Sequence, residues 1–314
     1  MSRKGKEGGV AHELKLPARA FQFIKVAVEN RVMTVQLSRP EERNAFTESM
    51  RAEIVQAFSD ASRDARVRAV VLTGDPAGNA FCAGASLGGG QFGGTDAASA
   101  LMDVPAGRRA DASTWRDGGG VAALSILRCT KPVIAAINGA AVGVGMTLPC
   151  ACDMRVAEAG SKVGFVFTRR GLACESVSSW LLPRIIGMGK AMELVLTGRV
   201  FDPRDAPDGL FNYVVPKGQA LAKAYELARE IADNTSGMSV ALSRLSLLRN
   251  ANMTPEQAHL TESKIIHFLI GSADNKEGVT SFLEKRPPNF TLEPWRDLPD
   301  FLPWWSQADT ESKL

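Results

Sequence analysis

The chain has 314 residues, of which 45% are hydrophobic and 23% charged, and its formal net charge is +3. This length and composition are typical of a globular protein with one large or two small domains. The weak positive charge forms no dense Lys/Arg block beyond the first few residues, which argues against a nucleic-acid-binding protein. No apolar run is long enough for a transmembrane helix. The five cysteines are scattered and complete no zinc pattern, so we expect reduced thiols and no bound metal.

The N-terminal half of the chain predicts strands that alternate with helices. Residues 1–20 are polar, and we expect a flexible segment there. Apolar and polar residues alternate on both sides of Asn30 and Arg31, which predicts a β-hairpin within 21–40. The other expected strands are 68–74, 132–139 and 154–159, and the expected helices are 47–64, 121–129 and most of 176–286. This order is typical of an α/β domain covered by C-terminal helices.

The segment from Gly84 to Gly120 is rich in Gly, Ala, Ser and Asp, and we expect an irregular loop there. Its residues 84–88 match the G-x-S-x-G pattern of a hydrolase nucleophile, with Ser86 at the centre. That function requires a helix after the serine and a histidine to activate it. Glycines follow Ser86 instead, and all three histidines are far away in the sequence. Some glycines of the segment also fit a dinucleotide-binding spacing, but no helix follows them directly, so a glycine-rich loop is the favoured interpretation.

Two expected strand ends run into turns of small residues, at 81–85 and at 138–145. Glycine lets backbone N–H groups point into a cavity and lets a ligand approach closely. The second turn opens a helix, whose free N–H groups favour negative charge. Each turn alone is compatible with an ordinary strand-to-helix connection. Two such N–H donors aimed at one oxygen would form an oxyanion hole.

Together these segments resemble the crotonase superfamily in their order and spacing. The most specific parts are FCAGASL at 81–87 and KPVIAAINGAAVGVG at 131–145. The supporting parts are RPEERNA at 39–45, Asp153, AMELVLTGRVFDPRDAPDGLFNYVVP at 191–216 and SFLEKRPPNF at 281–290. The resemblance covers nearly the whole chain, from about residue 21 to residue 290.

The resemblance implies an α/β fold, the crotonase spiral of ββα units with a C-terminal helical region. We expect the spiral core at 21–215, C-terminal helices for trimerisation or as a lid at 216–290, and a tail at 291–314. The tryptophans of this tail are expected to pack against the body of the protein. Members of the superfamily form trimers or dimers of trimers, so a homotrimer or hexamer is expected.

The resemblance also implies a site for an acyl-coenzyme A thioester. The backbone N–H groups of Ala85 and Val144 match those that hold the thioester oxygen. Removal of a proton beside the thioester carbonyl gives an enolate, whose charge two N–H donors stabilise. Coenzyme A is part of the substrate, and no separate cofactor is expected. Contacts with the substrate are implied for Arg43, Ala45, Ala83, Ala85, Gly143, Val144 and Lys285.

The acid–base residues decide which reaction follows. Classical hydratases of the superfamily use two glutamates, and the matching positions here hold Thr147 and Phe167, neither of which transfers protons as a carboxylate does. Glu175 matches the sole base of the Δ3,Δ2-enoyl-CoA isomerases. We expect desolvation by apolar neighbours to raise the pKa of this carboxyl. Glu175 is also compatible with an acidic residue at the start of the helix expected from 176.

These residues favour an enoyl-CoA isomerase that moves a double bond from C3 to C2. One alternative is a hydratase or dehydratase, in which Glu175 and water act on a specialised acyl chain. Another is a non-catalytic crotonase-fold scaffold. Ser312, Lys313 and Leu314 form a peroxisomal import signal, which predicts a peroxisomal protein with the import receptor as a partner. Neither nucleic acid nor a membrane is an expected partner.

Overall fold

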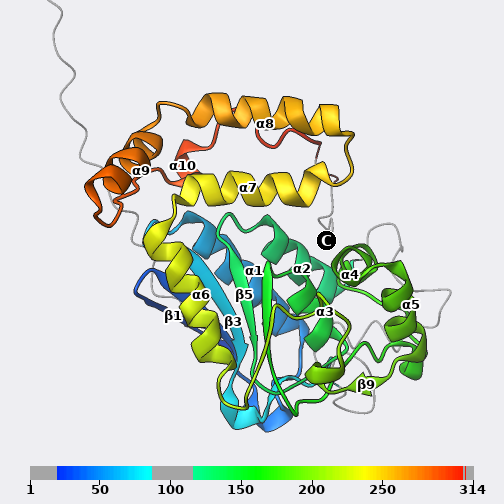
Figure 1. The fold of residues 1–314 in the computed structure, drawn as a ribbon. Helices are drawn as coiled ribbons and strands as arrows, with labels where there is room; N and C mark the ends of the chain where they lie inside the picture. Colours follow the sequence, from blue (N-terminus) through cyan, green and yellow to red (C-terminus); the bar gives the residue numbers. More distant parts are fainter. Residues whose placement is uncertain (1–19, 87–115, 307, 309–314) are drawn as a thin grey trace, which may run out of the picture.

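The structure is a computed structural model that describes residues 20–86, 116–306 and 308 (Figure 1). The expected flexible N-terminal segment, most of the glycine-rich segment and the C-terminal tripeptide lie outside the described residues. Within the described part, no helix is long and apolar enough to cross a membrane.

A six-stranded sheet forms the centre of the molecule, in the order β1-β2-β3-β5-β7-β10. All neighbouring strands are parallel except β1 and β2, which form the expected hairpin. The long strands predicted from apolar runs are therefore confirmed. Their bounds are Ile24–Glu29, Val32–Leu37, Ala69–Gly74, Val133–Ile137, Met154–Glu158 and, for the short β10, Tyr213–Val215.

A second sheet of four short strands, β4-β6-β8-β9, lies beside the first and was not predicted from the sequence. Its strands have only two or three residues each, too few for a period to be recognised. Their bounds are Ala80–Cys82, Ala140–Val142, Val163–Gly164 and Val200–Phe201.

The two sheets together make the expected ββα spiral. A long strand of the first sheet is followed by a short strand of the second sheet and then by a helix, in the units β3-β4-α2, β5-β6-α3 and β7-β8-α4. The helices are α2 (Gly118–Arg128), α3 (Val144–Cys150) and α4 (Ser178–Ile186), and α5 (Met188–Thr197) follows α4 directly.

Helices cover both faces of the six-stranded sheet. On one face, α1 (Glu48–Arg63) buries the apolar stripe predicted for it. On the other face, α6 (Ala220–Asn234) lies across β3, β5 and β7 (Figure 1). Alanine side chains are short, so this helix can lie close to the sheet. The buried stripe of α6 consists of Ala220, Ala224, Ala228 and Ala232.

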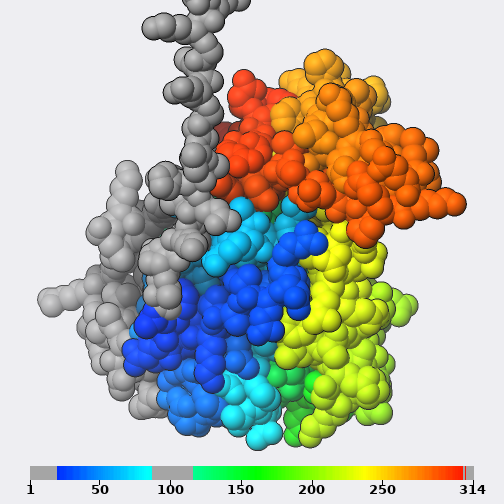
Figure 2. Space-filling model, turned by 90° about the vertical axis from the view of Figure 1, so that its left-hand side faces the viewer, coloured from blue at the N-terminus to red at the C-terminus, as the bar shows by residue number. Residues whose placement is uncertain are grey.

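The C-terminal helices form one end of the molecule, beyond α6 and the N-terminal strands (Figures 1 and 2). They are α7 (Gly237–Asn250), α8 (Pro255–Leu269), α9 (Ala273–Glu284) and the short α10 (Pro294–Asp297). Arg244 of α7 fastens this end to the spiral. It pairs with Asp153 at 2.6 Å and donates to the carbonyls of Leu127 and Cys129 at 2.9 and 2.8 Å. Those carbonyls lie at the C-terminal end of α2, where helix carbonyls need outside donors.

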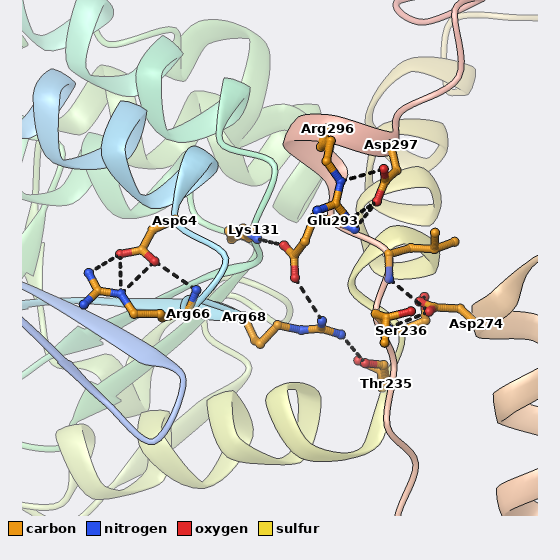
Figure 3. Close-up of polar contacts among 12 residues, drawn as sticks. Asp64, Arg66, Arg68, Lys131, Thr235, Ser236, Asp274, Glu293, Arg296 and Asp297 are labelled. Atoms are coloured by element: carbon orange, nitrogen blue, oxygen red, sulfur yellow. Dashed lines mark hydrogen bonds and ion pairs between the residues drawn. The ribbon is translucent and has the colours of Figure 1, made fainter. Parts of the chain in front are cut away.

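A buried ion cluster holds the tail against the core (Figure 3). Glu293 lies between Lys131, at 3.2 Å, and Arg68, at 3.7 Å, and Arg68 also donates to the carbonyl of Thr235 at 2.8 Å. Desolvation by burial lowers the pKa of Lys131, while Glu293 opposes this shift. Further along the tail, Arg249 lies 4.3 Å from the ring centre of Trp305. Trp304 packs against a core cluster that includes Met238, so Trp304 and Trp305 contact the body as expected, whereas Trp295 is exposed.

Two helix starts differ from the prediction. Helix α2 begins at Gly118 instead of residue 121, because Asp117 caps it and Gly118, Gly119 and Gly120, expected at the end of the irregular segment, form its first turn. Helix α4 begins at Ser178 instead of residue 176, because Ser176 and Val177 both have left-handed backbone conformations, with φ of 58°. Most of the region 176–286 is helical, as expected, although it also contains the short strands β9 and β10.

Candidate active site

The two small-residue turns lie side by side because β4 and β6 are parallel neighbours. Gly84 and Gly143 occupy the turns with φ of 101° and 57°, conformations that favour glycine. A Cβ atom on Gly143 would lie 4.0 Å from the Cα atom of Gly84. Two residues further, a Cβ on Gly145 would lie 2.1 Å from the carbonyl oxygen of Cys82, so the first turn of α3 packs directly on β4.

The N–H groups of Ala85 and Val144 have no acceptor within the described residues. Their neighbours do: Ser86 donates to Phe46 O at 2.9 Å, and Gly143 donates to Gly164 O at 3.0 Å. Val144 is the first residue of α3, and a helix leaves its first N–H groups without internal partners. Counting only partners among the described residues, each of the two adjacent turns thus offers one free backbone donor.

The segment expected to contact coenzyme A lies against the first of these turns. Ala83 donates to the carbonyl of Arg43 at 3.1 Å, and Phe46 donates to the carbonyl of Gly84 at 2.9 Å. Ala45 lies within this segment and is buried, whereas the side chain of Arg43 is exposed. The structure therefore brings these predicted contact residues together. Ser86, which had no predicted role, donates to Glu42 at 2.9 Å.

Lys285 does not join this group within one chain. It is an exposed C-cap of α9. Helix α9 lies at the opposite side of the molecule from α3 and α4 (Figure 1). A contact between Lys285 and coenzyme A at the site of the same chain has no support from this arrangement, and its predicted role stays untested.

Glu175 lies beside the first turn of α3, in the segment that precedes α4. Its Oε1 accepts a hydrogen bond from Thr147 Oγ1 at 3.0 Å, and its Oε2 accepts one from Ser176 Oγ. Thr147 follows Val144 by one helical turn and contacts the Val144 carbonyl at 3.4 Å. The carboxyl group is thus placed one helical turn from Val144, whose N–H has no acceptor within the described residues. Because α4 begins three residues later, Glu175 is not a first-turn residue of that helix.

The surroundings of Glu175 raise its pKa from 4.5 to about 7. Burial of the charged form is the largest cause, and a hydrogen bond and charge repulsion from Asp117 add to it. The hydroxyl groups of Ser176 and Thr147 act in the opposite direction because they donate to the carboxylate. A carboxyl group with a pKa near neutrality can both accept and return a proton.

The sequence reasoning missed three of these neighbours. Thr147 was interpreted only as a lost glutamate, yet it donates to the carboxyl that is present. Ser176 and Asp117 had no predicted role. Glu175 adjoins Ser176 in the sequence, so this contact could have been suspected, whereas Asp117 is reached only through folding. Phe167, the other lost glutamate position, is buried.

Comparison with known proteins agrees with the fold. The family model for enoyl-CoA hydratase/isomerase matches residues 27–293. An enoyl-CoA hydratase of Alternaria alternata is 40% identical over 263 residues, 82% of each chain. The 1,2-epoxyphenylacetyl-CoA isomerase of Escherichia coli (strain K12) is 33% identical over 280 residues, 86% of this chain and 99% of that protein. The crystal structure of an enoyl-CoA hydratase from Bacillus anthracis has a TM-score of 0.73 at 28% identity, and the match covers 86% of this chain and 99% of that one.

The chain therefore belongs to the enoyl-CoA hydratase/isomerase family, within the crotonase superfamily. It is an acyl-CoA enzyme of the hydratase/isomerase class, since relatives with both kinds of name match most of its length.

Proposed function

We propose that the protein is an enoyl-CoA isomerase that moves a double bond from C3 to C2 of an acyl-CoA thioester. Glu175 removes a proton from C2, and the electrons of the broken C–H bond form an enolate on the thioester. The same carboxyl then returns the proton at C4. The free N–H groups of Ala85 and Val144 hold the thioester oxygen while it carries the negative charge.

The observation that carries this proposal is the half-buried carboxyl of Glu175, with a pKa of about 7, one helical turn from the free amide of Val144. Isomerisation needs a single group that is ionised before the reaction and protonated during it. A carboxyl of ordinary pKa would be a weaker base towards the C2 proton. Both positions used by the two-glutamate hydratases lack a carboxyl, since they hold Thr147 and Phe167.

Hydration is a second candidate, and the names of relatives favour it. The proteins of Alternaria alternata that are 40% identical to this chain are named enoyl-CoA hydratases. In that reaction Glu175 would activate water for addition at C3, and the proton on C2 would come from the same carboxyl. The oxyanion site would serve both reactions equally.

A product screen in deuterated water separates the two candidates. The purified enzyme is incubated with 3-enoyl and 2-enoyl thioesters of several chain lengths. The proposal expects conversion of a 3-enoyl to a 2-enoyl thioester, with solvent label entering at C4. Formation of a 3-hydroxyacyl thioester from the 2-enoyl substrate, without any shift of the double bond, would replace the isomerase by the hydratase.

Substrate contacts, assembly and location stay predictions of the sequence. Arg43, Ala45, Ala83 and Gly143 are proposed to line the coenzyme A side of the site, because they surround the two turns. A homotrimer or hexamer is testable by light scattering. The peroxisomal signal is testable by fusing residues 291–314 to a fluorescent protein and observing whether the fusion enters peroxisomes.

A further inference from the structure

We infer that Asp117 is a positioning residue for Glu175, which holds the carboxyl of the base in place and favours its protonated form in the free enzyme. This inference rests on the proposed role of Glu175 in proton transfer. Asp117 itself need not touch the substrate. It acts through its contacts with Glu175 and with the backbone that carries Glu175.

Asp117 links three parts of the site. It is the N-cap of α2, and its Oδ1 accepts the N–H of Gly120. The same oxygen accepts the N–H of Ser176 at 3.3 Å. Ser176 Oγ in turn donates to Glu175 Oε2. The Asp117 carboxyl also raises the pKa of Glu175, through hydrogen bonding and charge repulsion.

A hydrogen bond between two carboxyl groups requires a proton on one of them, since two carboxylates can only accept. Asp117 accepts two backbone N–H groups at the N-terminus of a helix, where negative charge is stabilised. Burial is the largest influence on Glu175, and it disfavours the charged form of that carboxyl. Burial and the neighbouring Asp117 carboxyl therefore both favour the protonated form of Glu175.

Asp117 also helps to fix an unusual backbone conformation directly after Glu175. Ser176 and Val177 both have a φ of 58°, which is unusual for non-glycine residues and especially for a β-branched one. Such conformations persist where surrounding contacts fix them. The acceptance of the Ser176 N–H by Asp117, and the bond from Ser178 Oγ to the Glu175 carbonyl at 2.6 Å, are two such contacts.

Other ionisable groups near the pair do not substitute for Asp117. On the β4 side, burial raises the pKa of the Cys82 thiol to about 11, so it is neutral near neutral pH. On the α1 side, Glu48 and Arg51 pack against Gly118 and pair with each other. Among the described residues, Asp117 is thus the carboxyl that raises the pKa of Glu175.

The network predicts that substitutions of different neighbours change the pKa of Glu175 in opposite directions. Asp117→Asn keeps an oxygen that accepts the two N–H groups, and asparagine is as good an N-cap as aspartate. It removes the charge, so the titration midpoint of Glu175 moves down by about one pH unit or more. Thr147→Val and Ser176→Ala each remove a donor to the carboxylate, so both raise the pKa of Glu175. If the substitutions merely disordered the site, the pKa of Glu175 would change in the same direction in all three variants.

The test is a carboxyl-carbon NMR titration of the free enzyme, with the Glu175 signal assigned by its absence in Glu175→Gln. Asp233→Asn is the control, because it also removes one negative charge, in this case from an exposed ion pair between α6 and Arg31. This variant leaves the pKa of Glu175 unchanged. If Asp117→Asn unfolds, Asp117→Ser retains a capping oxygen without charge and serves the same comparison.

The inference is overturned if Glu175 titrates in Asp117→Asn as it does in the wild type. It is also overturned if Asp233→Asn shifts the titration of Glu175 as much as Asp117→Asn does. The measurement needs no substrate, so it stands whether or not the isomerase assignment holds. Where the enzyme does turn over a thioester, the acid limb of kcat/KM in Asp117→Asn moves to lower pH by the same amount. A purely structural role of Asp117 would lower the rate without moving this limb.

Discussion

At the scale of the residue, the ionised carboxyl of Glu175 costs the protein stability. The pKa of Glu175 is raised from 4.5 to about 7, so the folded protein binds this proton more tightly than the unfolded chain does. The stabilisation is therefore fully present below the unfolded pKa and is lost as the pH rises through the folded pKa. Each tenfold change in proton affinity corresponds to about 1.4 kcal/mol. Because Glu175 is partly solvated, we expect the whole pKa shift to change the free energy of unfolding by only roughly 2 kcal/mol.

Glu175→Gln should consequently become more stabilising, relative to the wild type, as the pH rises. We expect the free energy of unfolding of the variant to gain on that of the wild type by roughly 2 kcal/mol between about pH 4.5 and pH 8. Urea unfolding at the two pH values measures this. A difference between variant and wild type that does not change with pH would mean that the carboxyl titrates normally.

The pH dependence of the wild-type reaction follows from the same group. In the proposed reaction Glu175 must be ionised to take the proton from C2, so kcat/KM is expected to rise with pH and to level off above about 7. One pH unit below that pKa, the rate constant is expected to be about tenfold lower than the plateau. Steady-state kinetics across this range checks the prediction, and a flat profile would exclude a base with a raised pKa.

At the scale of the element, the N-terminus of α2 carries the most specific prediction. A Cβ on Gly119 would lie 1.8 Å from Glu175 Oε2 and 2.2 Å from Ser176 Oγ. Gly119→Ala therefore forces the carboxyl to move, and we expect a loss of kcat/KM of about 100-fold or more. Alanine is the better helix former by about 1 kcal/mol in a helix interior, which offsets part of the cost of displacing the carboxyl.

Gly189→Ala is the matched control, since Gly189 lies within α5 and a Cβ there would meet nothing within 4 Å. It should leave activity unchanged. Thermal unfolding reports the stability of both variants, and kcat/KM reports whether Gly119→Ala alone loses activity. If Gly119→Ala keeps full activity, Glu175 does not need the position that the structure gives it.

Helices and strands with a clear hydrophobic period were predictable from the sequence. Contacts between side chains of different helices and strands were not. Helix α1 and strands β3 and β5 have long buried stripes, so the pattern alone located them. The start of α2 was misplaced because glycine is a poor helix former, and only the approach of Glu175 explains its use there. The resemblance supplied Ala85, Val144 and Glu175. Asp117 has no signal of its own in the sequence, because its role depends on how α2 meets the segment before α4.

At the scale of the whole molecule, the ion cluster around Glu293 fixes the C-terminal end to the core. Lys131 and Arg68 have only 2% and 5% of their side chains exposed, and both pair with Glu293. Removing the carboxylate leaves two buried positive charges unpaired. Glu293→Gln is therefore expected to lower the free energy of unfolding by about 3 kcal/mol or more.

Glu284→Gln is the comparison for this prediction, because it breaks an exposed pair with Arg286 and should change stability by less than about 1 kcal/mol. Urea unfolding of both variants gives the contrast. Equal effects would show that the Glu293 cluster contributes no more than a surface ion pair.

The central claim is that Glu175 transfers the proton of an acyl-CoA enolate held by two backbone amides. The most direct measurement is solvent deuterium exchange at C2 and C4 of a 3-enoyl thioester, compared between the wild type and Glu175→Gln. We predict exchange and double-bond shift in the wild type, and neither in the variant, while the variant still binds the thioester. Exchange at the wild-type rate in Glu175→Gln would contradict the account.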